Sequence, residues 1–237
     1  MKTTLKPYKS TDCDSYASGA YAAMELIAAR PELVREVLIH PAFAEPENLR
    51  LLCVKKGIPA VCGEKPFLRL NQKENTYVLA VFQKREAILA PGEPHVVLVN
   101  PADMGNLGTV ARTMAGFGFG ELAVVTPAAD VWHPKTVRAS MGALFRVNVA
   151  RFAGFEAYRA AFPAHKLFPF MPNGALELGR GRRPAEPFTL VFGNEATGLD
   201  ARFSRIGTSV RIPQTELVDS LNLAVAAAIG MYAFSRG

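Results

Sequence analysis

The first third of the chain alternates between short apolar runs and helix-like stretches. Three of its runs have the aliphatic and β-branched composition of strands: VREVLI at 34–39, IPAVC at 58–62 and YVLAVF at 77–82. Residues 15–29 and 46–57 have the composition of helices, and Gly57 provides a stop for the second one. The pattern predicts a small α/β unit.

The rest of the chain continues this alternation. Four further runs are typical of strands: HVVLV at 95–99, ELAVV at 121–125, FTLVF at 188–192 and SVRIP at 209–213. Helix-like stretches also occur in this region: VARTMAGF at 110–117, FEAYRAAF at 155–162 and LNLAVAAAIGMYAF at 221–234. Because strands that alternate with helices form parallel sheets, we expect an α/β domain with a mostly parallel sheet.

The stretch KREAILAPGEP at 84–94 separates the two regions. Its two prolines and one glycine lie close together and discourage both helix and strand, so it predicts a linker. The expected domains are residues 1–88 and residues 93–237.

Composition and charge narrow the class of protein. A chain of 237 residues with 49% hydrophobic residues can bury a substantial core. Its net charge of +6 and pI near 9.3 permit an anionic partner such as RNA without requiring one. GRGRRP at 179–184 is a short basic patch, for which an RNA phosphate contact and a solvated loop are both open.

Cysteine and histidine usage argues against disulfides and metal. Cys13, Cys53 and Cys62 form no C-x-x-C pair, and the histidines lack the spacing of metal ligands. The beginning of the chain lacks the apolar core of a signal peptide, and the apolar run at 221–234 is too short to span a bilayer. We therefore expect a cytoplasmic protein with no metal and no membrane contact.

A glycine-bearing turn in NPADMGNLGTVARTMAGFG, at 100–118, raises the question of a nucleotide site. It lacks the G-x-G-x-x-G spacing directly after a strand, and the next strand ends in Thr126 rather than an acidic residue. The chain also has no G-x-x-x-x-G-K-[ST] motif. These absences disfavour a nicotinamide-dependent oxidoreductase and a nucleoside triphosphatase.

Arg112 is the single cation of the helix in this segment. Its neighbours three and four residues away are Gly108, Thr109, Ala115 and Gly116, so a bulky substrate can reach it. The alternative is a solvated or salt-bridged surface arginine.

Two further segments place polar residues where a ligand could bind. FTLVFGNEATGLD ends an apolar strand with Gly193, Asn194 and Glu195, and the carboxyl ends of strands are where open α/β sheets bind ligands. VRIPQTELVDSLNLAVAAA places Ser220 and Asn222 at the start of an alanine-rich helix. Ser220 could equally be an ordinary helix N-cap.

These three segments resemble, in order and spacing, the three motifs of the SpoU, or TrmH-like, branch of the SPOUT superfamily of RNA ribose 2′-O-methyltransferases. The resemblance implies an α/β domain with a deep trefoil knot, a homodimer, and S-adenosyl-L-methionine bound in the knotted loops. Residues 1–88 are similar, less specifically, to the small ribosomal-protein-like α/β domain that binds RNA substrate in many members.

The resemblance also implies roles for particular residues. Five would form the catalytic site: Asn106, Arg112, Glu195, Ser220 and Asn222. Three would hold the cofactor, largely through their backbone: Gly193, Ile212 and Leu221. Because arginine does not lose its proton in proteins, Arg112 would grip the ribose phosphate and stabilise the attacking oxygen rather than act as a base.

The expected function is transfer of a methyl group from S-adenosylmethionine to a ribose 2′-hydroxyl of RNA. Ribosomal RNA is favoured over transfer RNA by analogy with relatives that carry such an N-terminal domain. A noncatalytic RNA-binding module is the alternative from another class, because it explains the basic pI without needing the polar residues of the three motifs.

Overall fold

The structure, a computed structural model, describes residues 5–70, 76–179 and 184–235. Its contacts divide the chain into two compact units. The first unit contains Met1–Arg85 and Asp130–Arg146, and the second contains Glu86–Ala129 and Val147–Gly237. Residues 93–237 were expected to form one domain, whereas Asp130–Arg146 packs with the N-terminal residues.

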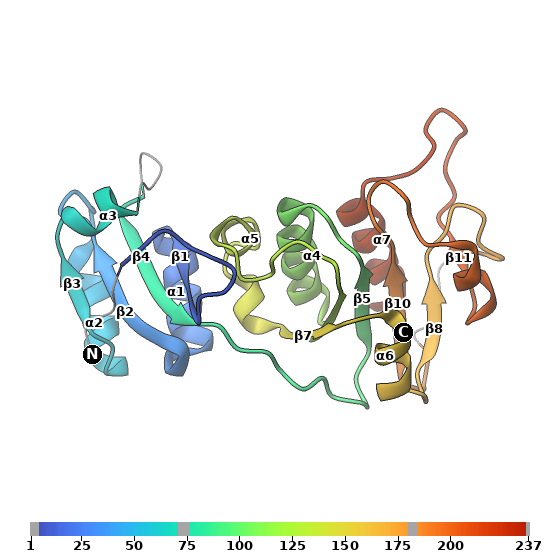
Figure 1. Cartoon of the computed structure of the whole chain (residues 1–237), viewed down its shortest axis with the longest axis horizontal. Helices are drawn as coiled ribbons and strands as arrows, with labels where there is room; N and C mark the ends of the chain where they lie inside the picture. The colour runs from blue at the N-terminus through green and yellow to red at the C-terminus, as the bar shows by residue number, and fades with distance from the viewer. Residues whose placement is uncertain (1–4, 71–75, 180–183, 236–237) are drawn as a thin grey trace. The chain divides into compact units, whose positions relative to one another are not determined.

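The first unit contains a four-stranded mixed sheet. Its elements are β1 (Asp14–Ser18), α1 (Ala20–Ala29), β2 (Val34–Ile39), α2 (Pro46–Lys56), β3 (Ala60–Cys62), α3 (Lys65–Arg69) and β4 (Val78–Gln83). The strand order is β1-β4-β2-β3, with β4 antiparallel to both of its neighbours and β2 parallel to β3 (Figure 1). Leu38 of β2 and Leu79 of β4 are fully buried and pack in one cluster with Phe67.

One predicted helix of this unit is shorter than expected. Residues 15–29 have helical composition, but Asp14–Ser18 forms a strand, and the helix begins only at Ala20. The strand exists because it pairs along its length with β4, a long-range contact that composition does not reveal. Gly19, at φ 100°, makes the turn between the two elements.

The segment Asp130–Arg146 is held in the first unit by buried contacts. It contains α5 (Pro134–Ala139) and the 3-10 helix η2 (Ala143–Arg146). The Ser15 hydroxyl donates to the carbonyl of Trp132 at 2.5 Å, and the rings of Phe82 and Phe145 meet edge to face at 5.0 Å. Burial of these aromatic side chains explains why the segment departs from the predicted domain division.

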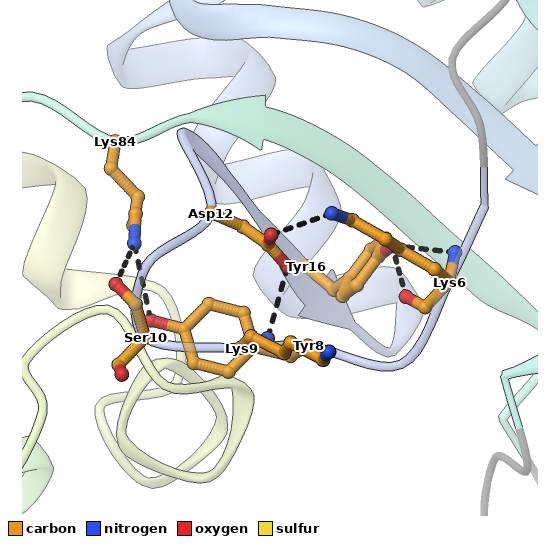
Figure 2. Close-up of polar contacts among 7 residues, drawn as sticks. All are labelled: Lys6, Tyr8, Lys9, Ser10, Asp12, Tyr16 and Lys84. Carbon is orange, nitrogen blue, oxygen red and sulfur yellow. Dashed lines mark hydrogen bonds and ion pairs between the residues drawn. The ribbon is translucent and has the colours of Figure 1, made fainter.

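The chain leading into β1 is fixed by polar contacts, which Figure 2 shows. Lys84 donates to the carbonyl of Ser10 at 2.8 Å, and Lys6 pairs with Asp12 at 2.6 Å. The Tyr16 hydroxyl donates to the carbonyl of Lys6 at 2.6 Å. These bonds hold the segment against β1 and the end of β4.

The second unit contains a five-stranded parallel sheet. Its main elements are β5 (His95–Val99), α4 (Met104–Phe117), β6 (Glu121–Val125), β7 (Asn148–Phe152), α6 (Phe155–Ala161), β8 (Lys166–Pro169), β10 (Phe188–Phe192) and α7 (Leu223–Ser235). The order is β7-β6-β5-β10-β8, and every pair is parallel. The predicted α/β fold with a mostly parallel sheet is confirmed. The predicted strand at 209–213 shrinks to β11 (Val210–Arg211), which pairs with β9 (Leu176–Glu177).

The two faces of this sheet are covered by different helices. On one face, Val97 and Val125 pack in a cluster with Phe155 and Tyr158 of α6. On the other face, Phe188 of β10 contacts Phe234 of α7, and α7 packs against α4 (Figure 1). Three segments therefore belong to this one packed unit: the loop after β5, the loop after β10 and the segment before α7.

Candidate functional site

The first loop of the site lies between β5 and α4. The Asp103 carboxylate accepts a hydrogen bond from the backbone N–H of Asn106 at 2.7 Å and so caps α4. This cap lets the helix begin at Met104, six residues before the predicted start at Val110. Asn106 therefore lies in the first turn of α4, and Arg112 lies farther along the same helix.

Glu195, which follows β10, binds this first loop. One carboxylate oxygen accepts from the backbone N–H of Ala102 at 2.9 Å, and the other accepts from that of Asp103 at 3.1 Å. The second oxygen also accepts from the side-chain amide of Asn106 at 3.2 Å. Three donors thus converge on one carboxylate at the start of a helix, where negative charge is favourable.

These hydrogen bonds determine the ionisation of Glu195. Partial burial acts to raise its pKa, but the backbone donors, among them Ala102 and Asp103, and the Asn106 amide together hold the pKa below the ordinary value. Glu195 is therefore ionised at neutral pH. Because it accepts three hydrogen bonds, its chemistry is that of a positioning group for the loop.

Asn222 joins the third segment to the same network. Its side-chain amide donates to the Asn106 side-chain oxygen at 3.0 Å, and its own oxygen accepts from the backbone N–H of Ala224 at 2.9 Å. Asn222 therefore caps α7, the role that the sequence left open for Ser220. The structure brings together Asn106, Glu195 and Asn222, one residue from each of the three motifs.

A cavity of about 470 Å³ opens beside this network. The three residues predicted to hold a cofactor line it, namely Gly193, Ile212 and Leu221, and so do Glu195 and Ser220. Its volume falls within the usual range of small-molecule sites. Arg112, Asn106 and Asn222 are not among the residues that line it.

Gly193 is required by a close approach of backbone. A Cβ at this position would lie 2.2 Å from the carbonyl carbon of Gly198. Gly198 itself has φ 64°, a left-handed conformation that favours glycine. The turn that begins at Gly193 therefore folds back on itself and presents backbone to the cavity.

Sequence reasoning missed several lining residues. Phe170, Asn173, Thr197 and Gln214 also face the cavity. Phe170 stacks on Phe192 with ring centroids 4.6 Å apart, which makes an aromatic wall. Thr197 was recognisable from its place beside Glu195, whereas Phe170 and Asn173 follow β8, a strand that the pattern did not predict.

Arg112 is exposed on α4. Across the described parts of the chain, no hydrogen bond or ion pair engages its guanidinium, unlike Arg151, Arg202 and Arg211, which have carboxylate partners. The structure does not bring Arg112 to the cavity wall, but it leaves all five N–H donors available.

Within residues 5–70, 76–179 and 184–235, no three His, Cys, Asp or Glu side chains are grouped as metal ligands would be. No helix in these same ranges has the length and apolar character needed to cross a bilayer. Most of the basic patch at 179–184 falls on residues 180–183, outside the described part of the chain.

Known proteins resemble the chain over most of its length. The SpoU rRNA Methylase family matches residues 93–232. The 23S rRNA (guanosine(2553)-2′-O)-methyltransferase RlmP of Bacillus subtilis is 29% identical over 210 residues, which are 85% of this chain and 81% of that protein. The 23S rRNA (adenosine(1067)-2′-O)-methyltransferase of Streptomyces laurentii is 29% identical, over 81% of this chain and 74% of that one.

Solved structures show the same architecture. The AdoMet-bound rRNA methyltransferase from Sinorhizobium meliloti has a TM-score of 0.78 and 25% identity, covering 94% of this chain and 87% of that one. The AdoMet complex of the SpoU methyltransferase AviRb from Streptomyces viridochromogenes also has a TM-score of 0.78, at 24% identity, covering 94% and 90% of the two chains. The likeness extends over both compact units.

Proposed function

Because the chain belongs to the SpoU rRNA methylase family, we propose that it transfers a methyl group from S-adenosyl-L-methionine to the ribose 2′-hydroxyl of a nucleotide in ribosomal RNA. One observation carries this assignment to the present chain. The three motif segments meet through the hydrogen bonds of Asn106 with Glu195 and Asn222, at the edge of a ligand-sized cavity. A noncatalytic RNA-binding module would need neither the network nor the cavity.

The cavity fits S-adenosylmethionine in size and chemistry. Ile212 and Leu221 offer apolar surface to an adenine ring, and Asn173 and Gln214 offer polar groups to a ribose or an amino-acid tail. The close turn at Gly193 leaves room for backbone contact with the cofactor. When bound there, the cofactor supplies an electrophilic methyl group on sulfur.

The side chains of the site divide into two roles. The Asn106 amide donates to Glu195 and accepts from Asn222, so we assign it to holding the loops, whereas the resemblance implied a place among the catalytic residues. Arg112, with free donors, would hold the ribose phosphate and stabilise the attacking oxygen. Ser220 lines the cavity and stays a predicted member of the catalytic site.

The substrate is proposed from the relatives. The two relatives compared above are named as 23S rRNA 2′-O-methyltransferases, which favours ribosomal over transfer RNA. We assign RNA binding to the N-terminal residues 1–88, because the residues that line the cavity all come from the second unit. Work on ribosomal RNA would place the enzyme in the cytoplasm.

We also propose the trefoil knot and the homodimer of the family. The position of β10 between β5 and β8 is compatible with a knotted C-terminal segment, and an experimental trace of the chain would test it.

On α4 and α7, Phe117, Val225 and Tyr232 expose 36%, 48% and 47% of their surface, which supports pairing through this face. A monomeric mass by light scattering at micromolar concentration would overturn the dimer.

The function is tested with the purified protein and with cells that lack it. We expect S-adenosylmethionine to bind in calorimetry and to label ribosomal RNA in vitro. Mapping of ribose methylation should reveal one or more sites that are lost in the deficient cells. An absence of cofactor binding, together with retained RNA binding, would favour the noncatalytic module.

A further inference from the structure

The side chain of Asn194 joins two loops of the site. Its amide nitrogen donates to the backbone carbonyl of Asn100 at 2.8 Å. Its amide oxygen accepts from the backbone N–H of Ala196 at 2.9 Å and from that of Thr197 at 3.1 Å. Only one orientation of the Asn194 amide satisfies all of these groups, because its NH₂ must face the Asn100 carbonyl and its oxygen must face the two backbone N–H groups.

Asn100 is built to receive this bond. It directly follows β5 and has a left-handed conformation, with φ 53°, which asparagine tolerates better than most residues. Its backbone N–H donates to the carbonyl of Val125 at 3.0 Å, and its side-chain amide donates to that of Pro127 at 3.1 Å. Asn100 is thus fixed to the end of β6, and its own carbonyl is turned toward β10.

The turn that carries Asn194 has little freedom. The backbone N–H of Gly198 donates to the carbonyl of Asn194 at 2.9 Å, and Gly193 and Gly198 are in close backbone contact. This turn lines the cavity and also holds Glu195, whose carboxylate caps the loop of Ala102. The bond from Asn194 to Asn100 is therefore a direct link from the cavity turn to the loop that begins α4.

We propose that Asn194 is a positioning residue that sets the spacing between the cavity turn, residues 193–198, and the loop, residues 100–103, that leads to Asn106 and Arg112. This inference rests on the proposed methyl transfer. Without this bond, Glu195 still joins the turn to Ala102 and Asp103, but the turn is no longer tied to Asn100, and the spacing of the two loops is less strictly set. Cofactor affinity and the rate of transfer then fall together in a folded protein, because one loop holds the cofactor and the other holds the residues that meet the RNA.

Two substitutions separate this role from simple support of the turn. Asn194→Asp keeps the acceptor for Ala196 and Thr197 but replaces the donor to Asn100 with an oxygen that repels its carbonyl. Asn194→Ala removes both functions. If the link between loops is what matters, the Asp variant should be at least as impaired as the Ala variant. If only the turn matters, the Asp variant should resemble the wild type.

We expect both variants to bind S-adenosylmethionine about tenfold more weakly in calorimetry, and their transfer at saturating cofactor to fall by about tenfold or more. Asn148→Ala is the control, because Asn148 donates to Glu121 at 2.8 Å at the opposite end of the sheet. It should lower the melting temperature without changing cofactor affinity. Circular dichroism checks that each variant is folded at the assay temperature.

The outcomes are distinct. If the wild type binds S-adenosylmethionine and Asn194→Asp has a cofactor affinity and a transfer rate within about twofold of the wild type, the positioning role is overturned and the proposed function stands. A wild type that binds no S-adenosylmethionine would overturn the proposed function and this inference with it. Equal impairment of both Asn194 variants beside an unimpaired Asn148 variant would support the proposal.

Discussion

The two ends of the parallel sheet carry polar clusters that contrast sharply. At the carboxyl ends, Asn106, Glu195 and Asn222 bond to one another and to loop backbone, beside a cavity. At the amino ends, His95 and His165 lie in a buried network in which Tyr158 and Thr189 supply the connecting hydroxyl groups. Both clusters use ordinary polar residues at strand ends.

The amino-end network is closed on itself. The His95 ring bonds the Tyr158 hydroxyl at 2.9 Å and the carbonyl of Ala90 at 2.9 Å. The His165 ring bonds the Thr189 hydroxyl and the carbonyl of Pro91, each at 2.9 Å. The network therefore fastens the linker to the sheet.

The difference shows how the cluster at the proposed site differs from a cluster that serves stability. In the amino-end network both ring nitrogens of each histidine are hydrogen-bonded and the side chains are buried, which serves stability. At the carboxyl ends the hydrogen bonds join three loops beside a cavity, and Arg112 is left with free donors. We therefore predict that substitutions at the carboxyl ends of the strands alter turnover, whereas substitutions at the amino ends alter stability.

The largest expected effect is at the carboxyl end. Arg112→Ala should reduce methyl transfer by roughly a hundred- to a thousandfold, the usual cost of about 2.7 to 4 kcal/mol for one preorganised charge-stabilising donor. Cofactor dissociation should change by less than about threefold, because Arg112 does not line the cavity. Single-turnover transfer from labelled cofactor to RNA, paired with calorimetry, measures both quantities.

Two further variants sharpen this test. Arg112→Lys should recover little activity, since an ammonium group cannot reproduce the planar fork that grips two oxygens. Arg159→Ala removes another exposed arginine, on α6 of the same unit, and should leave transfer unchanged. Near-normal transfer by Arg112→Ala would return this residue to the surface role that the sequence left open.

Several of the strands that the sequence predicted well are buried on both faces. The runs at 95–99, 121–125 and 188–192 form strands with these same bounds, because continuous aliphatic runs have few alternatives. Asn148–Phe152 and Lys166–Pro169 were missed because they are edge strands with polar or proline positions.

Three of the predicted site residues meet in the structure, but the network that they form could not be predicted. The resemblance carried by the three motifs implied that Asn106, Glu195 and Asn222 belong to one site, and the structure brings them into contact. Both carboxylate oxygens of Glu195 accept hydrogen bonds from the backbone of the loop. This arrangement depends on the directions of the backbone N–H groups, which the spacing of the motifs does not encode. His95 and His165, seventy residues apart, gave no sign of meeting, because their contact arises from the pairing of β5 with β10 and of β10 with β8.

The smaller expected effect is at the amino end and depends on pH. Burial lowers the pKa of His95 to about 4, the bond to the Ala90 carbonyl opposes this shift, and the nearby His165 adds to it. An unfolded histidine binds a proton below about pH 6.5. The stabilising contribution of neutral His95 is therefore fully present above about pH 6.5 and is lost as pH falls toward 4.

At about pH 5 this loss should amount to about 2 kcal/mol in the free energy of unfolding, since each pKa unit corresponds to about 1.36 kcal/mol and about 1.5 units separate pH 5 from the unfolded pKa. Urea unfolding at about pH 7.5, 6 and 5 measures it, with the unchanged m-value as a check on two-state behaviour.

His95→Gln isolates the effect from the other titrating groups. Glutamine has an amide in place of the ring and does not titrate, so the variant should be less stable than the wild type at about pH 7.5 but lose less stability on acidification. Cofactor affinity at about pH 7.5 should stay within about threefold of wild type, because the network lies at the end of the sheet away from the cavity. If the free energy of unfolding of His95→Gln depends on pH as strongly as that of the wild type, another titrating group is responsible for the dependence. A large loss of cofactor affinity in the folded variant would mean that the two ends of the sheet are not independent, and the contrast between a stabilising end and a functional end would fail.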